Sequence, residues 1–222
     1  MSDGPKVKIC GLTRSADARL ADDLGADYVG VVVSAGFSRS VQPERLGEVV
    51  AGTRAFRVAV LVDEAPEAAA ALARTMGAAV LQLHGDESVA VVRALRSEGD
   101  WRLWKAVRAQ SLEDVSRAVD RFADCVDGLL VEGWRDGVIG GAGAKLLLDP
   151  DSVRGAIPHH LEFVLAGGLA PDSVSVSVSR FRPDVVDVSS GVEASIGVKD
   201  PILMRTFFAS VRIPTDLPDV EP

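Results

Sequence analysis

Eight short apolar runs alternate with eight amphipathic segments along the chain. The runs are rich in Val, Leu and Ile and lie near residues 7–10, 28–33, 57–62, 79–84, 102–107, 128–132, 162–166 and 185–189. Most of them are apolar nearly throughout, which is typical of parallel strands buried on both faces. The amphipathic segments have a helical spacing of apolar residues and lie near 15–24, 43–52, 66–76, 87–97, 111–122, 150–156, 171–180 and 200–211.

This balanced alternation predicts an α/β protein built as a single (β/α)8 TIM barrel rather than as an open sheet. A length of 222 residues suits one such domain over the whole chain, 1–222. We expect flexible ends at 1–5 and 213–222, since the last ten residues hold three prolines and three acids. Capping and turn residues mark expected helix starts at Pro66, Asp86, Ser111 and Pro171-Asp172.

The charge balance argues against nucleic acid as a partner. With 24 Lys and Arg against 32 Asp and Glu, the formal net charge is −8, whereas nucleic-acid surfaces are normally basic. Cys10 and Cys125 lie far apart and form no disulfide framework, which is typical of a reducing compartment. No apolar run reaches about 18 residues, and residues 1–5 lack the features of a signal peptide. We therefore expect a cytoplasmic protein without a membrane partner, either a monomer or a homodimer.

Cys10 ends the first apolar run, where a barrel opens to the face that carries its chemistry. We interpret it as a thiolate general base, with a nucleophile as the second alternative. A base needs a pKa drawn toward neutrality, and Lys8, on the same face of the strand, would supply positive charge. The structural alternative is a cysteine that only packs, as we expect of Cys125 at the end of a helical segment.

Three other polar side chains follow apolar runs. Arg39 lies in a segment with glycine and two serines, and its planar guanidinium suits a substrate carboxylate. Glu132 would point its carboxyl group into the barrel mouth, as a general acid requires. For both residues the alternative is a solvated position at the rim. His84 is a candidate substrate contact, although a lone histidine is more often a hydrogen-bonded structural group.

Two glycine-containing stretches predict a divided phosphate site. They are Ala166-Gly167-Gly168-Leu169 after the seventh run and Ser189-Ser190-Gly191-Val192-Glu193 after the eighth. In barrels the corresponding loops often hold phosphate, because glycines let backbone N–H groups approach its oxygens. A third stretch, Gly140-Gly141-Ala142-Gly143, is either a loop that covers the substrate or a simple turn. Because no cluster of Cys, His and carboxylates has the spacing of metal ligands, we expect no metal.

At these positions the sequence resembles the phosphoribosylanthranilate isomerases of tryptophan biosynthesis. The resemblance covers most of the chain, residues 6–207, and its motifs are highly specific when taken together. The motifs are Lys8-Ile9-Cys10-Gly11-Leu12-Thr13, Leu24-Gly25-Ala26-Asp27-Tyr28-Val29-Gly30, Gln82-Leu83-His84-Gly85, Lys105-Ala106-Val107, Ala166-Gly167-Gly168-Leu169 and Val186-Asp187-Val188-Ser189-Ser190-Gly191-Val192-Glu193.

The resemblance implies an Amadori rearrangement of N-(5-phosphoribosyl)anthranilate to 1-(2-carboxyphenylamino)-1-deoxyribulose 5-phosphate, without cofactor or metal. A general acid opens the ribose ring to a Schiff base, and a general base then removes the proton from sugar C2. By resemblance, Cys10 is this base, Arg39 binds the anthranilate carboxylate and Asp187 is the strand-8 aspartate of the site. The backbone amides implied to hold the phosphate are those of Gly167, Gly168, Ser190 and Gly191.

The sequence departs from the family pattern at the general acid. The family has an aspartate in a Leu-Leu-Asp pattern, whereas this chain has Leu130-Val131-Glu132. Glutamate keeps the carboxyl group but extends it by one methylene, and a misplacement of about 1 Å can cost on the order of a hundredfold in rate. Asp136 is the alternative acid, while Asp149 aligns with the family's sixth helix. The segment Ser34-Ala35-Gly36-Phe37-Ser38-Arg39-Ser40 also lacks the family's usual proline and its aromatic residue after the arginine.

These features leave three functions open. The first is an isomerase whose partner is a small sugar-phosphate substrate, phosphoribosylanthranilate. The second is a divergent paralogue that isomerises a related aminoaldose phosphate in a specialised pathway, which Glu132 and the altered loops suggest. The third belongs to another class, a catalytically silent barrel that binds a sugar phosphate.

Overall fold

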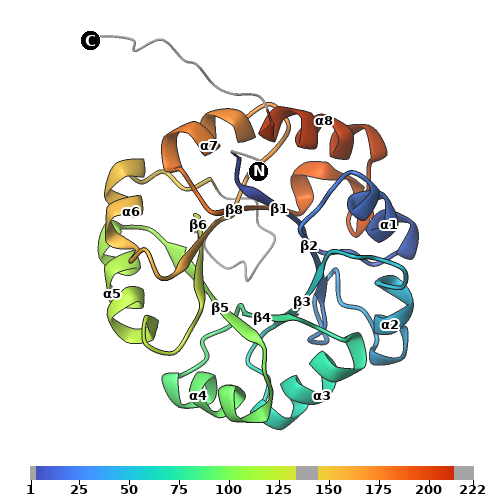
Figure 1. Cartoon of the computed structure of the whole chain (residues 1–222), viewed down its shortest axis with the longest axis horizontal. Helices are drawn as coiled ribbons and strands as arrows, with labels where there is room; N and C mark the ends of the chain where they lie inside the picture. Colours follow the sequence, from blue (N-terminus) through green and yellow to red (C-terminus); the bar gives the residue numbers. More distant parts are fainter. Residues whose placement is uncertain (1–3, 134–144, 213–222) are drawn as a thin grey trace.

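Eight parallel strands form a closed barrel in sequence order, and helices surround it as an outer ring (Figure 1). This computed structural model describes residues 4–133 and 145–212. The strands are β1 (Lys6–Ile9), β2 (Tyr28–Val32), β3 (Phe56–Leu61), β4 (Val80–Leu83), β5 (Arg102–Ala109), β6 (Gly128–Gly133), β7 (Glu162–Leu165) and β8 (Val185–Val188). The helices are α1 (Ser15–Asp23), α2 (Leu46–Val49), α3 (Pro66–Met76), α4 (Val89–Glu98), α5 (Leu112–Phe122), α6 (Pro150–Ala156), α7 (Val174–Phe181) and α8 (Pro201–Val211).

The structure confirms the TIM barrel, and each expected strand overlaps an observed one. The segment 43–52 is divided into a 3-10 turn, η1 (Pro43–Arg45), and the short α2. The loop after β8 holds elements that the sequence analysis did not anticipate. They are a 3-10 turn, η2 (Ser190–Val192), and a small antiparallel hairpin of β9 (Glu193–Ser195) and β10 (Val198–Lys199).

Two of the expected helix starts are wrong. The backbone N–H of Asp86 donates to Asp63 Oδ1 at 2.7 Å, so Asp86 belongs to the preceding loop, and Ser88 caps α4 through its side chain. Pro171 and Asp172 lie in a turn before α7, which begins at Val174. Pro66 is the first residue of α3, and Ser111 forms a capping box with Asp114, as expected.

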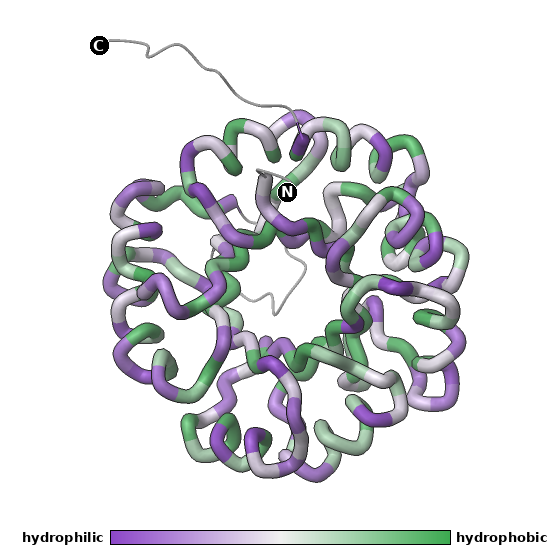
Figure 2. The backbone as a smooth tube through the Cα atoms, in the orientation of Figure 1, coloured by the Kyte–Doolittle hydropathy of each residue, from purple (hydrophilic) through white to green (hydrophobic). Residues whose placement is uncertain are grey.

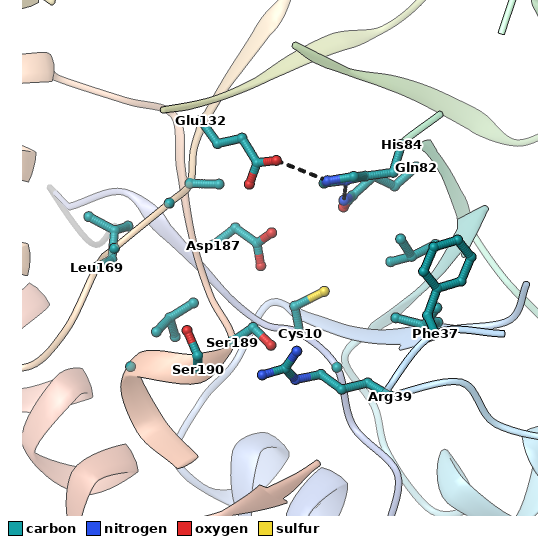
Figure 3. Close-up of a pocket in the computed structure, with 18 of the residues that line it drawn as sticks. Cys10, Phe37, Arg39, Gln82, His84, Glu132, Leu169, Asp187, Ser189 and Ser190 are labelled. Carbon is teal, nitrogen blue, oxygen red and sulfur yellow. Dashed lines mark hydrogen bonds and ion pairs between the residues drawn. The ribbon is translucent and has the colours of Figure 1, made fainter. Parts of the chain in front are cut away.

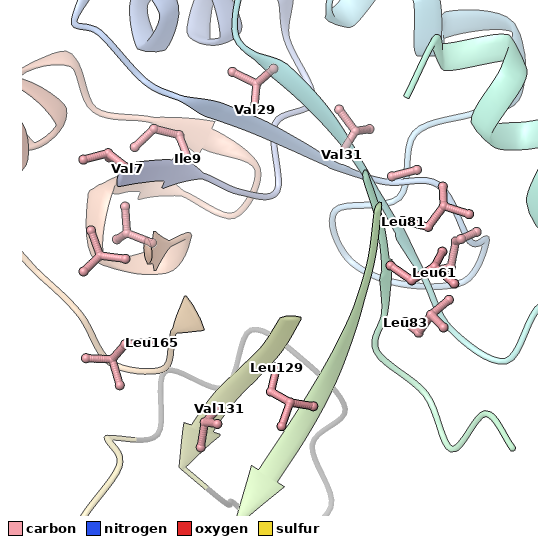
Figure 4. Close-up of a cluster of buried hydrophobic side chains, with 14 of the residues drawn as sticks. Val7, Ile9, Val29, Val31, Leu61, Leu81, Leu83, Leu129, Val131 and Leu165 are labelled. Atoms are coloured by element: carbon pink, nitrogen blue, oxygen red, sulfur yellow. The ribbon is translucent and has the colours of Figure 1, made fainter. Parts of the chain in front are cut away.

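Two apolar layers hold the barrel together, one outside the strands and one inside. Alternate strand residues such as Val29, Val31, Leu81 and Leu129 point outward and pack under the helices (Figure 4). A smaller cluster fills the interior, and its buried members are Tyr28, Val58, Val80, Trp104, Leu130, Val164, Ala166 and Val185. Figure 2 shows hydrophobic residues along much of the barrel wall, with hydrophilic residues on the outer turns of the helices. The interior is therefore a packed core, and a ligand can bind only above it.

Charged side chains close the amino-terminal end of the barrel. Lys6 Nζ lies 3.0 Å from Glu162 Oε1, and Arg102 also pairs with Glu162. Arg102 further donates to the hydroxyl of Tyr28 at 3.0 Å. Lys6, Arg102 and Glu162 thus form a floor below the apolar interior cluster, to which Tyr28 belongs.

Among residues 4–133 and 145–212, no helix is long and apolar enough to span a membrane. The expected flexible ends fall largely outside the described residues, which include only Gly4 and Pro5 of them.

Candidate active site

A pocket at the carboxyl ends of the strands collects the side chains predicted from the sequence (Figure 3). Parallel strands of a barrel all end at the same face, so residues far apart in sequence meet there. Phe37, Val32 and Val60 form an apolar part of its lining. The pocket is lined by all nine candidate site residues, namely Cys10, Arg39, His84, Glu132, Gly167, Gly168, Asp187, Ser190 and Gly191.

Cys10 directly follows β1 and is 8% exposed. Its backbone N–H donates to Val188 O at 2.8 Å, which fixes the end of β1 against the end of β8. Lys8 points into the barrel, on the same side of β1 as Cys10. Gly30 on β2 leaves room for both side chains, because a Cβ there would lie 3.0 Å from Cys10 Sγ and 3.0 Å from Lys8 Cε.

The surroundings of Cys10 favour the neutral thiol in the absence of a ligand. Burial raises the pKa of the Cys10 thiol, and the carboxylate of Asp187 raises it further. The ammonium groups of Lys8 and Lys199 lower it, but they do not outweigh the first two effects. The positive charge that we expected from Lys8 is therefore present, although the net shift of the thiol pKa is upward.

A chain of hydrogen bonds runs from the buried Lys8 to Glu132. Lys8 Nζ donates to Gln82 Oε1 at 2.9 Å, and Gln82 Nε2 lies 2.8 Å from His84 Nδ1. His84 Nε2 then lies 3.1 Å from Glu132 Oε1 (Figure 3). Gln82 and His84 are buried, and the side chain of Glu132 is 12% exposed. The side chain of Glu132 is therefore fixed at the pocket wall by its hydrogen bond with His84, and it is not a solvated carboxylate at the rim.

Asp187 offers the pocket an unused acceptor. Its Oδ2 pairs with Lys8 Nζ at 2.9 Å, whereas its Oδ1 is buried and accepts no hydrogen bond from the described part of the chain. A buried acceptor without a donor costs about 1–3 kcal/mol. A ligand hydroxyl that donates to Oδ1 would recover that cost.

Arg39 is held by a carboxylate from the loop after β8. Its Nε and one terminal nitrogen donate to Glu193 at 2.8 and 2.7 Å in a bidentate pair, and Lys199 Nζ reaches the same carboxylate at 2.9 Å. Burial would raise the pKa of Glu193, but the hydrogen bonds from Arg39 and Lys199 outweigh burial and lower it. The guanidinium is thus fixed in direction, with Nη1 as the nitrogen that Glu193 does not engage.

The two glycine stretches approach each other closely beside the pocket. Gly167 and Gly168 have positive φ values of 85° and 62°, which favour glycine at both positions. An added Cβ on Gly191 would lie 1.9 Å from the carbonyl oxygen of Leu169. The loop after β7 and the loop after β8 therefore touch backbone to backbone, which only glycine at position 191 permits.

Gly191→Ala is expected to destabilise the protein by about 1–3 kcal/mol, because the two loops must move apart to accept the methyl group. Thermal unfolding monitored by circular dichroism measures the effect. Gly155→Ala is the matched control, since Gly155 lies in α6 and an added Cβ there meets nothing within 4 Å. The control is expected to be neutral or stabilising, by up to about 1 kcal/mol. Equal melting temperatures for Gly191→Ala and the unchanged chain would contradict this account of the loop contact.

A family comparison identifies the kind of protein to which this arrangement belongs. The sequence matches a family model described as N-(5'-phosphoribosyl)anthranilate (PRA) isomerase over residues 7–210. The chain belongs to the phosphoribosylanthranilate isomerase family. The N-(5'-phosphoribosyl)anthranilate isomerase of Chromohalobacter salexigens is 40% identical over 210 residues, which cover 93% of each protein.

Solved structures of the phosphoribosylanthranilate isomerase family have the same fold. The enzyme from Thermotoga maritima gives a TM-score of 0.82 at 31% identity and covers 94% of this chain and 98% of its own. A second structure holds reduced 1-(o-carboxyphenylamino)-1-deoxyribulose 5-phosphate. It gives a TM-score of 0.79 at 30% identity, again over 94% of this chain and 98% of its own.

Several residues considered for this isomerase site in the sequence do not line the pocket or lie outside the described residues. Asp136 and the Gly140-Gly141-Ala142-Gly143 loop lie outside the described residues. Asp149 caps α6 by accepting from the backbone N–H of Ser152 at 2.8 Å, so it serves that helix. Cys125 is buried and its thiol contacts the carbonyl oxygen of Phe122, as expected of a packing cysteine.

Sequence reasoning missed three residues that organise this isomerase-family pocket. Gln82 appeared only within a motif, yet it connects Lys8 to His84. Glu193 and Lys199 were not assigned a role. Glu193 forms an ion pair with Arg39, and Lys199 Nζ donates to the carbonyl oxygen of Ser189 at 3.0 Å. No local sequence pattern marks these three residues. They stand out only as buried polar side chains, once the fold shows which residues they contact. In the part of the chain that the structure describes, no group of three or more His, Cys, Asp or Glu side chains could hold a metal.

Proposed function

We propose that this chain catalyses the Amadori rearrangement of N-(5-phosphoribosyl)anthranilate to 1-(2-carboxyphenylamino)-1-deoxyribulose 5-phosphate. The observation that carries the proposal is the convergence of a thiol, a held carboxyl group and an unused acceptor in one pocket, from Cys10, Glu132 and Asp187. Family membership supports the same reaction. The reaction moves protons within one molecule, so it needs no redox partner.

Glu132 acts as the general acid in the first step. Its proton passes to the ring oxygen of the ribose, the bond between that oxygen and C1 breaks, and the nitrogen lone pair forms a Schiff base at C1. The neighbouring His84 holds one oxygen of this carboxyl group at 3.1 Å. The longer side chain of glutamate is thus accommodated by a defined hydrogen bond at the wall of the pocket.

Cys10 acts as the general base in the second step. The thiolate takes the proton from sugar C2, and the bonding electrons form an enolamine that tautomerises to the ketoamine product. Figure 3 shows Cys10 and Glu132 on opposite sides of Asp187, which suits proton transfer at two different atoms of one sugar. Asp187 Oδ1 accepts a hydrogen bond from a sugar hydroxyl in this arrangement.

Each end of the substrate has matching groups. The Nη1 of Arg39 donates to the anthranilate carboxylate, and the apolar lining at Phe37 and Val32 packs against the aromatic ring. Phe37 precedes the arginine in sequence and so compensates for the missing aromatic residue after it. Backbone N–H groups of the glycine loops hold the phosphate, at Gly167, Gly168, Ser190 and Gly191.

A turnover assay with the purified chain tests this function. Loss of the fluorescence of phosphoribosylanthranilate is followed at limiting substrate, with product identified by mass and chromatography. We expect catalysed conversion to the ketoamine. Binding of the substrate without turnover would favour the catalytically silent barrel instead.

A related aminoaldose phosphate is the second candidate substrate. It is favoured by one observation, that Glu193 already occupies two of the five N–H groups of Arg39, so a substrate carboxylate would have to share the guanidinium with a carboxylate of the protein. Comparing kcat/KM for phosphoribosylanthranilate with that for an analogue lacking the carboxylate decides between the two. A higher kcat/KM for the analogue would identify the related aminoaldose phosphate as the better substrate. A cytoplasmic location and a monomeric or homodimeric state remain predictions from the sequence.

Asp187→Asn is expected to move the ionisation of Cys10 to lower pH. The Asp187 carboxylate raises the pKa of the thiol, so its removal lowers that pKa and leaves the Lys8 ammonium free to stabilise the thiolate. The pH dependence of alkylation by iodoacetamide measures the change, because only the thiolate reacts. The measurement is made in a Cys125→Ala background so that one thiol is observed. An unchanged or higher alkylation midpoint would contradict the role assigned to Asp187.

A further inference from the structure

We propose that Gln82 is a positioning residue that fixes the tautomer of His84 and thereby decides which oxygen of Glu132 carries the acid proton. The proposal rests on the function above, in which Glu132 is the general acid. It depends on the direction of each hydrogen bond in the chain from Lys8 to Glu132, and elementary chemistry determines those directions one after another.

The first direction is set by Lys8. Its ammonium group can only donate, so the Gln82 atom 2.9 Å away must be the amide oxygen. Burial favours the neutral amine, but Asp187 and Cys10 together outweigh burial and raise the pKa of Lys8 above its ordinary value. The side chains of both Lys8 and Gln82 are almost fully buried, so no solvent competes for this contact.

The second direction follows from the first. With its oxygen facing Lys8, the amide of Gln82 presents its NH2 group to His84 Nδ1 at 2.8 Å. Nδ1 must therefore accept, which places the ring hydrogen on Nε2. An imidazolium ring would carry a hydrogen on Nδ1 as well, and two donors would then face each other across this short contact.

The third direction locates the acid proton. Nε2–H of His84 donates to Glu132 Oε1 at 3.1 Å, so Oε1 acts as an acceptor and the carboxyl hydrogen belongs on Oε2. Figure 3 shows the second carboxyl oxygen of Glu132 directed away from His84, toward Asp187. The proton of the acid thus faces the space where the sugar binds. In the other tautomer Nε2 would accept, and the proton would be held between Glu132 and the histidine.

Gln82→Glu tests the proposal because it is nearly isosteric and replaces the donor to Nδ1 by an acceptor. In the unchanged chain, 15N NMR is expected to show His84 with hydrogen on Nε2 and none on Nδ1 at neutral pH. In Gln82→Glu, hydrogen is expected on Nδ1. The His84 signals are assigned by their loss in His84→Asn, since His159 and His160 are also present. Hydrogen on Nδ1 in the unchanged chain would overturn the proposal.

Kinetics test whether Gln82 acts through His84. Gln82→Glu is expected to lower kcat by about tenfold to a hundredfold, with a much smaller change in KM. In a His84→Asn background the same substitution should have no further effect on kcat. A full additional loss there would show that the new charge at position 82 acts directly, and would overturn the proposal.

The two hypotheses can fail separately. The NMR signature is read without substrate, so it decides the tautomer whether or not the chain turns over phosphoribosylanthranilate. Absence of turnover by the unchanged chain would contradict the proposed function. If Gln82→Glu does not fold, the NMR spectrum of the unchanged chain still decides the direction of the hydrogen bonds.

Discussion

Cys10→Ala is expected to lower kcat by about a hundredfold to ten-thousandfold, the range that a lost general base produces. Alanine removes the thiol that we propose accepts the C2 proton, and this thiol lines the pocket. The phosphate loops and Arg39 remain in place, so KM should change far less than kcat. Steady-state assays are made over a range of pH, because burial and the Asp187 carboxylate raise the pKa of the thiol, so the thiolate forms at higher pH than for an ordinary cysteine.

Cys125→Ala is the matched control for Cys10→Ala. It removes a second buried thiol that contacts the carbonyl oxygen of Phe122 and does not line the pocket. Its kcat is expected to equal that of the unchanged chain. If Cys10→Ala kept full activity, the base would have to be another group, and the mechanism proposed here would be wrong.

Glu132→Gln is expected to lower kcat by about a hundredfold to ten-thousandfold as well. The amide keeps the size of the side chain and can still accept from His84 Nε2, but its N–H protons are not acidic enough to be transferred to the ring oxygen. Pre-steady-state measurements are the sharpest readout, since the variant should stop before ring opening. Unchanged formation of the Schiff base would show that another acid opens the ring.

Glu132→Asp is the companion variant for Glu132→Gln. Aspartate retains the ionisable group that the family pattern has at this position, but it withdraws the carboxyl group from His84. We expect partial activity, between that of Glu132→Gln and that of the unchanged chain. A gain in turnover of phosphoribosylanthranilate would instead support a site adapted to a related aminoaldose phosphate.

The fold and the membership of the pocket could be predicted from the sequence because both depend on local patterns. Strands buried on two faces are apolar throughout, and the carboxyl end of each strand lies at the barrel mouth. That reasoning placed Cys10 and Glu132 at one pocket, and the family resemblance added Asp187. Their assigned roles remain predictions, because location alone does not establish chemistry.

The polar partners inside the pocket could not be predicted because they depend on the closure of the barrel. Lys8 and Gln82 are 74 residues apart, and His84 and Glu132 are 48 apart, so no local spacing connects them. The hairpin that carries Glu193 and Lys199 was also missed, since β9 and β10 are only three and two residues long and lack an apolar run. Asp86 was misassigned for a similar reason, because its partner Asp63 lies in another loop.

The closed floor of the barrel determines by which route product leaves the pocket. Lys6, Arg102 and Glu162 pair across one end beneath a packed interior, so the residues that the structure describes leave no passage from the pocket through the barrel. Product must leave by the opening through which substrate enters. Each catalytic cycle therefore ends with product leaving through the single opening of the pocket, and the next substrate can enter only after product has left.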